Sequence, residues 1–331
     1  MRIHLKGAAA LLVVAAFVAT PAVAFADTPT DGNADALAAA VSRIAPEQGT
    51  TLDLSKSGGD YTASTATTTV KVADNAIVSV TSNLSGASLA VQTPTAGISA
   101  VEAKDGTLTY DAGSSSTAVA VQAVEQGVRI ATILKDASAA TEYSYPLQTP
   151  VGSTVTRDAD TGAILVTGAD GKFVGGFAPA WAKDANGTAV PTRYEIRGSS
   201  VVQVVDIHTG NFTYPVVADP YFGVDLIDHA SWVHYSDGWT IQVYPTGWAR
   251  QNAGNYAVGT FDWDELYTKY SNRGLNTNLN GMRDQLICHQ QFVAVRSPGK
   301  ASWNIDEWRP DVGYAQTVAQ SCNPGGARWF D

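Results

Sequence analysis

The chain has 331 residues, of which 45% are hydrophobic and 16% are charged, with 30 glycines, 14 prolines and 2 cysteines. This apolar content is enough for a folded core, so the composition excludes a disordered chain, a collagen and a miniprotein built on disulfides. The formal net charge of -10 argues against nucleic-acid binding, because neutralising phosphates requires a basic surface.

Residues 1–26 have the order of a secretory signal peptide. Two basic residues precede an apolar run at residues 7–18, and Ala24 and Ala26 form the small-residue pattern of a cleavage site. The apolar run is shorter than the roughly 20 residues that span a bilayer, and no later stretch is long and apolar enough. We therefore expect a secreted protein, extracellular or cell-wall associated, cleaved near Ala26 and without a transmembrane segment.

The tryptophans and cysteines divide the remaining chain near Tyr221. Seven of the eight tryptophans and both cysteines lie in residues 222–331. A change of composition this large between adjoining segments predicts a domain boundary. We expect a short helix and flexible lead-in at residues 27–60, a β-rich domain at 61–221 and a small α+β domain at 222–331.

Residues 35–44 have helical composition and stop before Pro46. The segment 61–221 then consists of short β-branched or alternating runs separated by Asp-Gly, Asn-Gly and similar turn pairs, with no helical pattern between them. This organisation predicts an antiparallel β-sandwich or an open barrel. The clearest strand runs are residues 69–72, 77–80, 118–121, 128–133, 163–166 and 201–205.

The β-rich segment ends in Tyr214-Pro-Val-Val-Ala-Asp-Pro220. Together with Ala185-Asn-Gly187 and the run at residues 190–195, this ending resembles a β-rich region of secreted actinobacterial proteins that precedes differing C-terminal modules, some of them suspected toxins. The resemblance implies no particular chemistry.

In the C-terminal segment, alternation on both sides of Asp237 and Gly238 predicts a hairpin over residues 229–244. Ala230, Trp232 and His234 would lie on one face of the first strand, and Trp239, Ile241 and Val243 on one face of the second. Helical spacing predicts three helices, at residues 262–270 with acids in the first turn, at 281–293 and at 311–320. A strand from Phe292 onward is the alternative for the end of the second helix.

Five separated motifs occur in order in the last 100 residues or so. They are Tyr244-Pro-Thr-Gly-Trp-Ala-Arg250, Gly281-Met-Arg-Asp-Gln285 with Cys288-His289, Pro298-Gly-Lys300, Trp303-Asn304 with Trp308-Arg-Pro310, and Cys322-Asn-Pro-Gly325. Together they resemble a C-terminal domain of unknown function from secreted actinobacterial proteins. The resemblance carries no activity or catalytic residue over to this chain.

Cys288 and Cys322 are the two cysteines of a chain that we expect to be exported into oxidising surroundings, so a disulfide between them is the natural pairing. The alternative is a nucleophile and base formed by Cys288 and His289. Consecutive helical residues point about 100° apart, which excludes a direct side-chain hydrogen bond within that pair.

Candidate catalytic residues are weak. His289, Asp306 and Glu307 are the best of them, and the common hydrolase and nucleotide-enzyme motifs do not occur. The carboxylates at residues 262–265, like those at 306 and 307, are better explained as helix-start or surface charge. The spacing of the histidines and cysteines fits no metal site, and we expect neither a metal nor a cofactor.

The aromatic side chains favour binding over catalysis. Most must form the core of so small a domain, but two or three should remain exposed for stacking, with arginines beside them for hydrogen bonding. The candidate ligand-binding residues are Trp232, Trp239, Trp248, Arg250, Arg283 and Arg309. The sequence therefore predicts a non-catalytic module that binds an extracellular glycan, cell-wall polymer or protein; an unfamiliar secreted hydrolase and an effector directed at competing cells are the alternatives.

Overall fold

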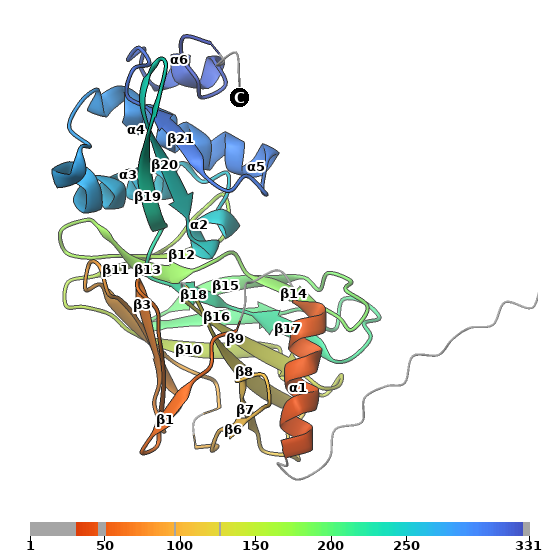
Figure 1. Ribbon diagram of the computed structural model, residues 1–331. Coiled ribbons are helices and arrows are strands. Elements are labelled where there is room, and N and C mark those ends of the chain that lie inside the picture. Colours follow the sequence, from red (N-terminus) through yellow and green to blue (C-terminus); the bar gives the residue numbers. More distant parts are fainter. Residues whose placement is uncertain (1–30, 46–50, 96, 126, 327–331) are drawn as a thin grey trace, which may run out of the picture.

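The computed structural model describes residues 31–45, 51–95, 97–125 and 127–326 (Figure 1). The signal peptide expected at residues 1–26 lies outside this part of the chain. Within the described residues, no helix is both long and apolar enough to cross a lipid bilayer.

The first large sheet contains eight strands in the order β1-β2-β3-β4-β5-β10-β16-β15. These are β1 (Ser55–Ser57), β2 (Asp60–Ser64), β3 (Thr68–Val72), β4 (Ile77–Ser82), β5 (Ser88–Gln92), β10 (Glu142–Gln148), β16 (Ser200–Val205) and β15 (Thr192–Arg197). Each neighbouring pair is antiparallel.

The second large sheet has ten strands. Its main path is β11 (Thr154–Arg157), β12 (Ile164–Thr167), β13 (Phe173–Phe177), β18 (Tyr221–Gly223), β9 (Gly127–Leu134), β8 (Thr117–Val124), β7 (Leu108–Asp111) and β6 (Val101–Glu102), while β17 (Val216–Asp219) joins β9 to β14 (Trp181–Lys183). The pairs are again antiparallel.

Side chains from both sheets meet in one buried cluster. Val70 and Val80 face each other across β3 and β4, and Ile130 and Phe177 enter the same cluster from the second sheet. The six runs predicted as strands all fall on observed strands. The prediction of a mostly antiparallel β-structure is therefore confirmed, as two large sheets with a shared core.

Helix α1 (Asp31–Ile44) covers strands β8 and β9 of the second sheet. Leu37, Val41 and Ile44 recur at helical spacing and are buried there, which explains why this stretch is helical. The helix predicted at residues 35–44 is confirmed and begins at Asp31.

Beyond β18 the chain forms a three-stranded antiparallel sheet, β19 (Ile227–Tyr235), β20 (Gly238–Pro245) and β21 (Trp303–Asp306), surrounded by helices (Figure 1). The helices are α2 (Gly247–Gln251), α3 (Tyr256–Tyr270), the 3-10 turn η1 (Ser271–Arg273), α4 (Leu279–Cys288), the π-helical turn η2 (His289–Val293), α5 (Ala294–Arg296) and α6 (Tyr314–Ala319). The predicted hairpin is confirmed, with Trp232 opposite Ile241 and His234 opposite Trp239.

Helix α3 begins at Tyr256, six residues before the predicted start. Asn255 is its N-cap, and the Asn255 side chain accepts a hydrogen bond from the Val258 N–H. Asp262 and Asp264 are therefore in the middle of the helix. The expectation that these acids occupy the first turn was wrong.

The second predicted helix is confirmed and extends further than expected. Helix α4 continues without a break through η2 and α5 to Arg296, so no strand begins at Phe292. The disulfide between Cys288 and Cys322 is also present, with 5.4 Å between the two Cα atoms. It ties the end of α4 to the tail that follows α6.

The C-terminal region and the second large sheet share a hydrophobic cluster. Trp248 and Ile241 from the C-terminal region pack there with Leu165 and Tyr221 from the β-rich region. The residues that join β18 to β19, numbers 224–226, are buried. The composition change near Tyr221 thus falls in strand β18 of the second large sheet, and the connection that follows it is buried.

Candidate functional site

An open groove on the C-terminal region is lined by Trp232, Trp239, Gly274 and Glu307. We call these four residues the tryptophan groove. Its cavity volume is about 370 Å³. The lining combines two aromatic rings, a residue without a side chain and one carboxylate, a composition suited to stacking and to a single polar contact.

The hairpin register brings the two rings together. Trp232 is opposite Ile241 on β20, and Trp239 is two residues before Ile241, so both indoles are on one face of the hairpin. The Trp232 Nε1–H donates a hydrogen bond to the Arg273 carbonyl, with an N–O distance of 2.9 Å. Trp239 is 45% exposed. One ring is therefore fixed by the protein and the other is available to a ligand.

Gly274 lies beside the Trp232 indole. It follows η1 with a φ of +100°, and a Cβ there would lie 3.2 Å from the Trp232 Nε1. A side chain at this position would be strained and would crowd the ring edge. Residues 272–280 contain Gly274 and several asparagines, but nothing in the sequence indicated that this segment would meet Trp232.

Glu307 completes the groove just after β21. Its N–H donates to the Trp239 carbonyl at 3.1 Å, which holds the backbone of residue 307 next to that of Trp239. The Thr277 hydroxyl donates to Glu307 Oε2 at 2.9 Å. Thr277 was not predicted as a functional residue. Of the three catalytic candidates from the sequence, Glu307 is the one in the groove.

Two predicted ligand-binding residues are inaccessible. Trp248 is fully buried, and its Nε1–H donates to the Gly176 carbonyl at 3.0 Å. Arg309 is 2% exposed, and its Nε lies 2.6 Å from Asp306 Oδ2. Both expectations of accessibility are corrected, because these side chains hold the core and β21 in place.

The other two arginines are outside the groove lining. Arg250 donates hydrogen bonds to the carbonyls of Pro298, Lys300 and Ala301, and so it supports the loop before β21. Arg283 is partly exposed and lies 3.6 Å from Asp284. The grouping of these arginines with the exposed tryptophans is thus not observed.

His289 and Asp306 are also buried. The His289 Nδ1 is 2.8 Å from the carbonyl oxygen of Gln285, and burial lowers the pKa of His289 to about 4. The Gln285 side chain instead pairs with β21, accepting from the Asp306 N–H and donating to the Asp306 carbonyl. Asp306 is held by Thr240 and Arg309. The interpretation of Asp306 as helix-start or surface charge is corrected.

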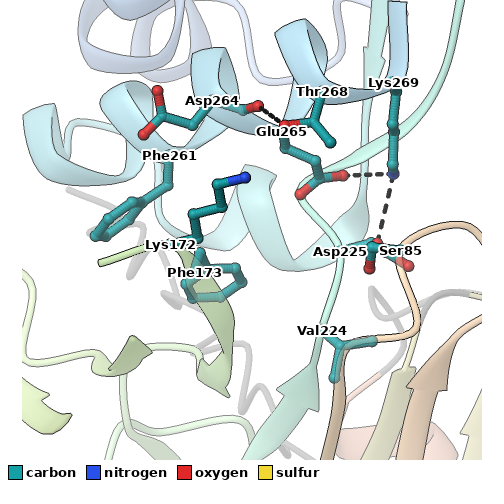
Figure 2. Close-up of a pocket in the computed structure, with 10 residues that line it drawn as sticks. All are labelled: Ser85, Lys172, Phe173, Val224, Asp225, Phe261, Asp264, Glu265, Thr268 and Lys269. Atoms are coloured by element: carbon teal, nitrogen blue, oxygen red, sulfur yellow. Dashed lines mark hydrogen bonds and ion pairs between the residues drawn. The ribbon is translucent and has the colours of Figure 1, made fainter. Parts of the chain in front are cut away.

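A second, smaller cavity of about 70 Å³ lies where α3 meets the β-rich region (Figure 2). Phe261, Asp264, Glu265, Thr268 and Lys269 line it from α3. The other lining residues are Ser85, Lys172, Phe173, Val224 and Asp225. Its size is well below that of the tryptophan groove.

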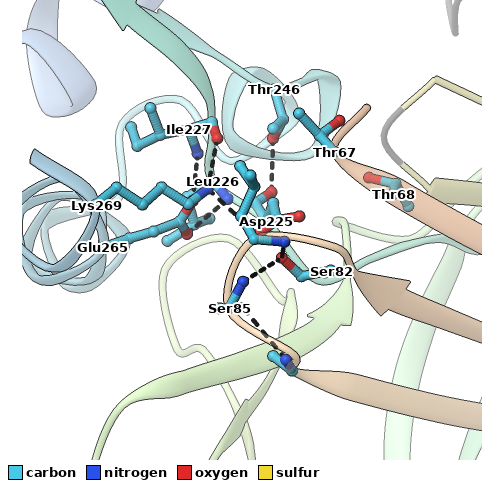
Figure 3. A network of polar contacts seen from close by, with 12 residues as sticks. Thr67, Thr68, Ser82, Ser85, Asp225, Leu226, Ile227, Thr246, Glu265 and Lys269 are labelled. Carbon is cyan, nitrogen blue, oxygen red and sulfur yellow. Dashed lines mark hydrogen bonds and ion pairs between the residues drawn. The ribbon is translucent and has the colours of Figure 1, made fainter. Parts of the chain in front are cut away.

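The side chains of Glu265 and Lys269 bind the backbone at the end of the buried connection between β18 and β19, and we call this pair the clamp (Figure 3). Glu265 accepts hydrogen bonds from the N–H groups of Leu226 and Ile227, each at 2.9 Å. Lys269 lies 2.6 Å from Glu265 and 3.4 Å from Asp225. Burial disfavours the charge of Lys269, but Glu265 and Asp225 hold its pKa above the usual value. The clamp satisfies backbone groups and has a structural role.

Residues 227–325 match the family described as "Protein of unknown function (DUF2599)". The C-terminal region therefore contains a DUF2599 domain, and the resemblance to an actinobacterial domain of unknown function is confirmed. Uncharacterized proteins of Mycobacterium tuberculosis and Mycobacterium bovis are each 34% identical over 102 residues, which is 30% of this chain and 66% of theirs. An uncharacterized protein of Mycobacterium leprae is 28% identical over 108 residues, 32% of this chain and 85% of its own.

This chain spans slightly less than two thirds of the length of the tuberculosis and bovis relatives. No solved structure shows a significant match to it.

Proposed function

We propose that this is a secreted, non-catalytic protein in which a small α+β domain, residues 222–331, is carried on a β-sandwich and binds an extracellular ligand. The tryptophan groove is the binding site. The observation that carries the proposal is the exposed Trp239 ring beside a fixed Trp232 ring in an open groove. Aromatic side chains of this kind dominate binding energy when they are accessible.

The carboxylates support binding over hydrolysis. Glycoside hydrolysis requires two carboxyl groups about 5 to 9.5 Å apart on either side of the scissile bond. Glu307 is the single carboxylate lining the described part of the groove, while Asp306 is engaged with Arg309. His289 is buried away from solvent. The groove residues therefore support capture of a ligand without its turnover.

Secretion is supported by the sequence of residues 1–26 and by the Cys288–Cys322 disulfide, a bond typical of oxidising compartments. The ligand would then belong to a cell surface or its surroundings, as a glycan, a cell-wall polymer or a protein.

The experiment is capture of the labelled full chain by intact mycobacterial cells, since the relatives belong to that genus. We expect Trp239→Ala to reduce capture at least tenfold, because an accessible aromatic residue at a binding site contributes roughly 2 kcal/mol or more. Tyr267→Ala is the matched control, since Tyr267 is 42% exposed on α3 and is outside the groove lining. Equal capture by wild type and Trp239→Ala would refute the proposal.

A further inference from the structure

We infer that the tryptophan groove receives an arginine side chain of a partner protein. The inference rests on the proposed function and specifies the ligand of the same site. It follows from the charge of the groove, from the faces of its rings and from a similar arrangement inside this chain.

Glu307 brings a negative charge to an otherwise apolar lining. Its carboxylate accepts a hydrogen bond from Thr277, and no lysine, arginine or histidine of the described residues lies within ion-pair distance of it. A cationic partner stabilises a carboxylate that lies between apolar walls, because the walls reduce the screening of their attraction by water. The acidic chain, with its net charge of -10, favours the approach of a basic partner.

The rings favour a cation with an apolar stem. The Trp232 N–H is already used by the Arg273 carbonyl, so this N–H is not available to hydrogen-bond a ligand and the apolar part of the ring remains for contact. Tryptophan faces attract cations, and arginine adds planar stacking and a three-carbon stem that packs on aromatic surface. A neutral sugar would stack equally well but would leave the Glu307 charge without a counter-charge.

The chain uses the same chemistry next to the groove. The Arg309 guanidinium carbon lies 4.4 Å from the centre of the Trp308 ring, and the Arg309 Nε lies 2.6 Å from Asp306. This internal arrangement combines a guanidinium, a tryptophan face and a carboxylate. The tryptophan groove supplies the same kind of ring and carboxylate, and none of its described lining residues supplies a guanidinium, which we assign to the partner.

The test uses the full chain and two peptides, Ac-Gly-Arg-Gly-amide and its uncharged counterpart with citrulline in place of arginine. NMR of the Trp239 indole N–H reports occupancy of the groove. We expect the arginine peptide to bind about tenfold or more tightly than the citrulline peptide, in keeping with the combined cation–π and ion-pair contributions. Glu307→Gln should reduce this preference to the part that the tryptophan faces supply, while its thermal midpoint stays within about 2 °C of wild type.

Treating the cells with protease before the capture experiment separates this inference from the proposed function. Loss of Trp239-dependent capture after protease supports an arginine-bearing protein partner. Trp239-dependent capture that survives protease, or equal binding of the two peptides, overturns the arginine assignment and leaves the proposed function standing. If Trp239→Ala has no effect on untreated cells, the proposed function itself is wrong.

Discussion

His289 is a buried, neutral imidazole next to the disulfide. It makes its hydrogen bond within its own helix, to the Gln285 carbonyl, and burial lowers its pKa to about 4. In the unfolded chain the imidazole gains its proton near the ordinary value of 6.5. The neutral histidine therefore adds stability that is complete above pH 6.5 and is lost as the pH falls toward about 4.

We predict that His289→Gln flattens the loss of stability between pH 6.5 and pH 4. Glutamine does not titrate, so the folded and unfolded states no longer differ in the number of protons that residue 289 binds. Urea denaturation at several pH values measures the effect. His208→Gln is the control, because His208 is exposed. A slope in His289→Gln equal to that of wild type would contradict the prediction.

Burial is the residue-scale property that the sequence predicted least well. Trp239 and Trp248 each directly follow a glycine, yet the first is 45% exposed and the second is fully buried. Asp262 was expected at a solvated helix start, and in the structure it is fully buried and its pKa is raised by burial and by Glu265. Such outcomes depend on which distant segment covers a side chain, and local spacing does not contain that information.

The clamp attaches helix α3 to the chain segment that connects β18 to β19. Glu265 and Lys269 are one helical turn apart on the same face of α3, and together they bind the backbone of residues 226 and 227. The helix is thus fixed by polar contacts as well as by its apolar side.

We predict that Lys269→Met lowers the free energy of unfolding by about 3 to 5 kcal/mol, because the carboxylates of Glu265 and Asp225 lose their buried cation. Chemical denaturation measures the change. Lys172→Met is the matched control, since Lys172 lines the same cavity but is exposed, and we expect a change below about 0.5 kcal/mol. Similar losses in both variants would argue against the clamp.

Elements with local signals were predictable. The hairpin has alternation on both sides of an Asp-Gly turn, and the disulfide joins the two cysteines of the chain. The start of α3 was missed, because Ala257 to Phe261 include Gly259 and residues with low helix propensity. That first turn is helical because Asn255 caps it and Gly259 packs closely on Ile287.

At the scale of the whole molecule, the β-rich region and the C-terminal region are joined by a common core. Trp248 belongs to α2, yet its ring packs on Phe173 with 4.9 Å between centroids and its N–H is bound by Gly176. The groove residues belong to the C-terminal region. That region packs on the second large sheet, which belongs to the β-rich region.

We predict that the full chain shows one calorimetric transition and that Trp248→Ala shifts the whole of it, with a loss of about 3 to 5 kcal/mol. The reason is that the cavity would open in the cluster shared by both regions. Trp239→Ala, at an exposed ring, should leave the transition almost unchanged. Two separate transitions, of which the variant shifts one, would show that the regions unfold independently.

The packed connection between β18 and β19 has a mechanical consequence. Figure 1 shows the hairpin turn and α1 at opposite ends of the molecule. Tension between a partner held at the hairpin and the N-terminal end would pass directly into β18, since the three connecting residues are buried and offer no slack. Strand β18 is hydrogen-bonded on both sides, to β13 and β9. Force would therefore be shared among backbone hydrogen bonds on both sides of β18.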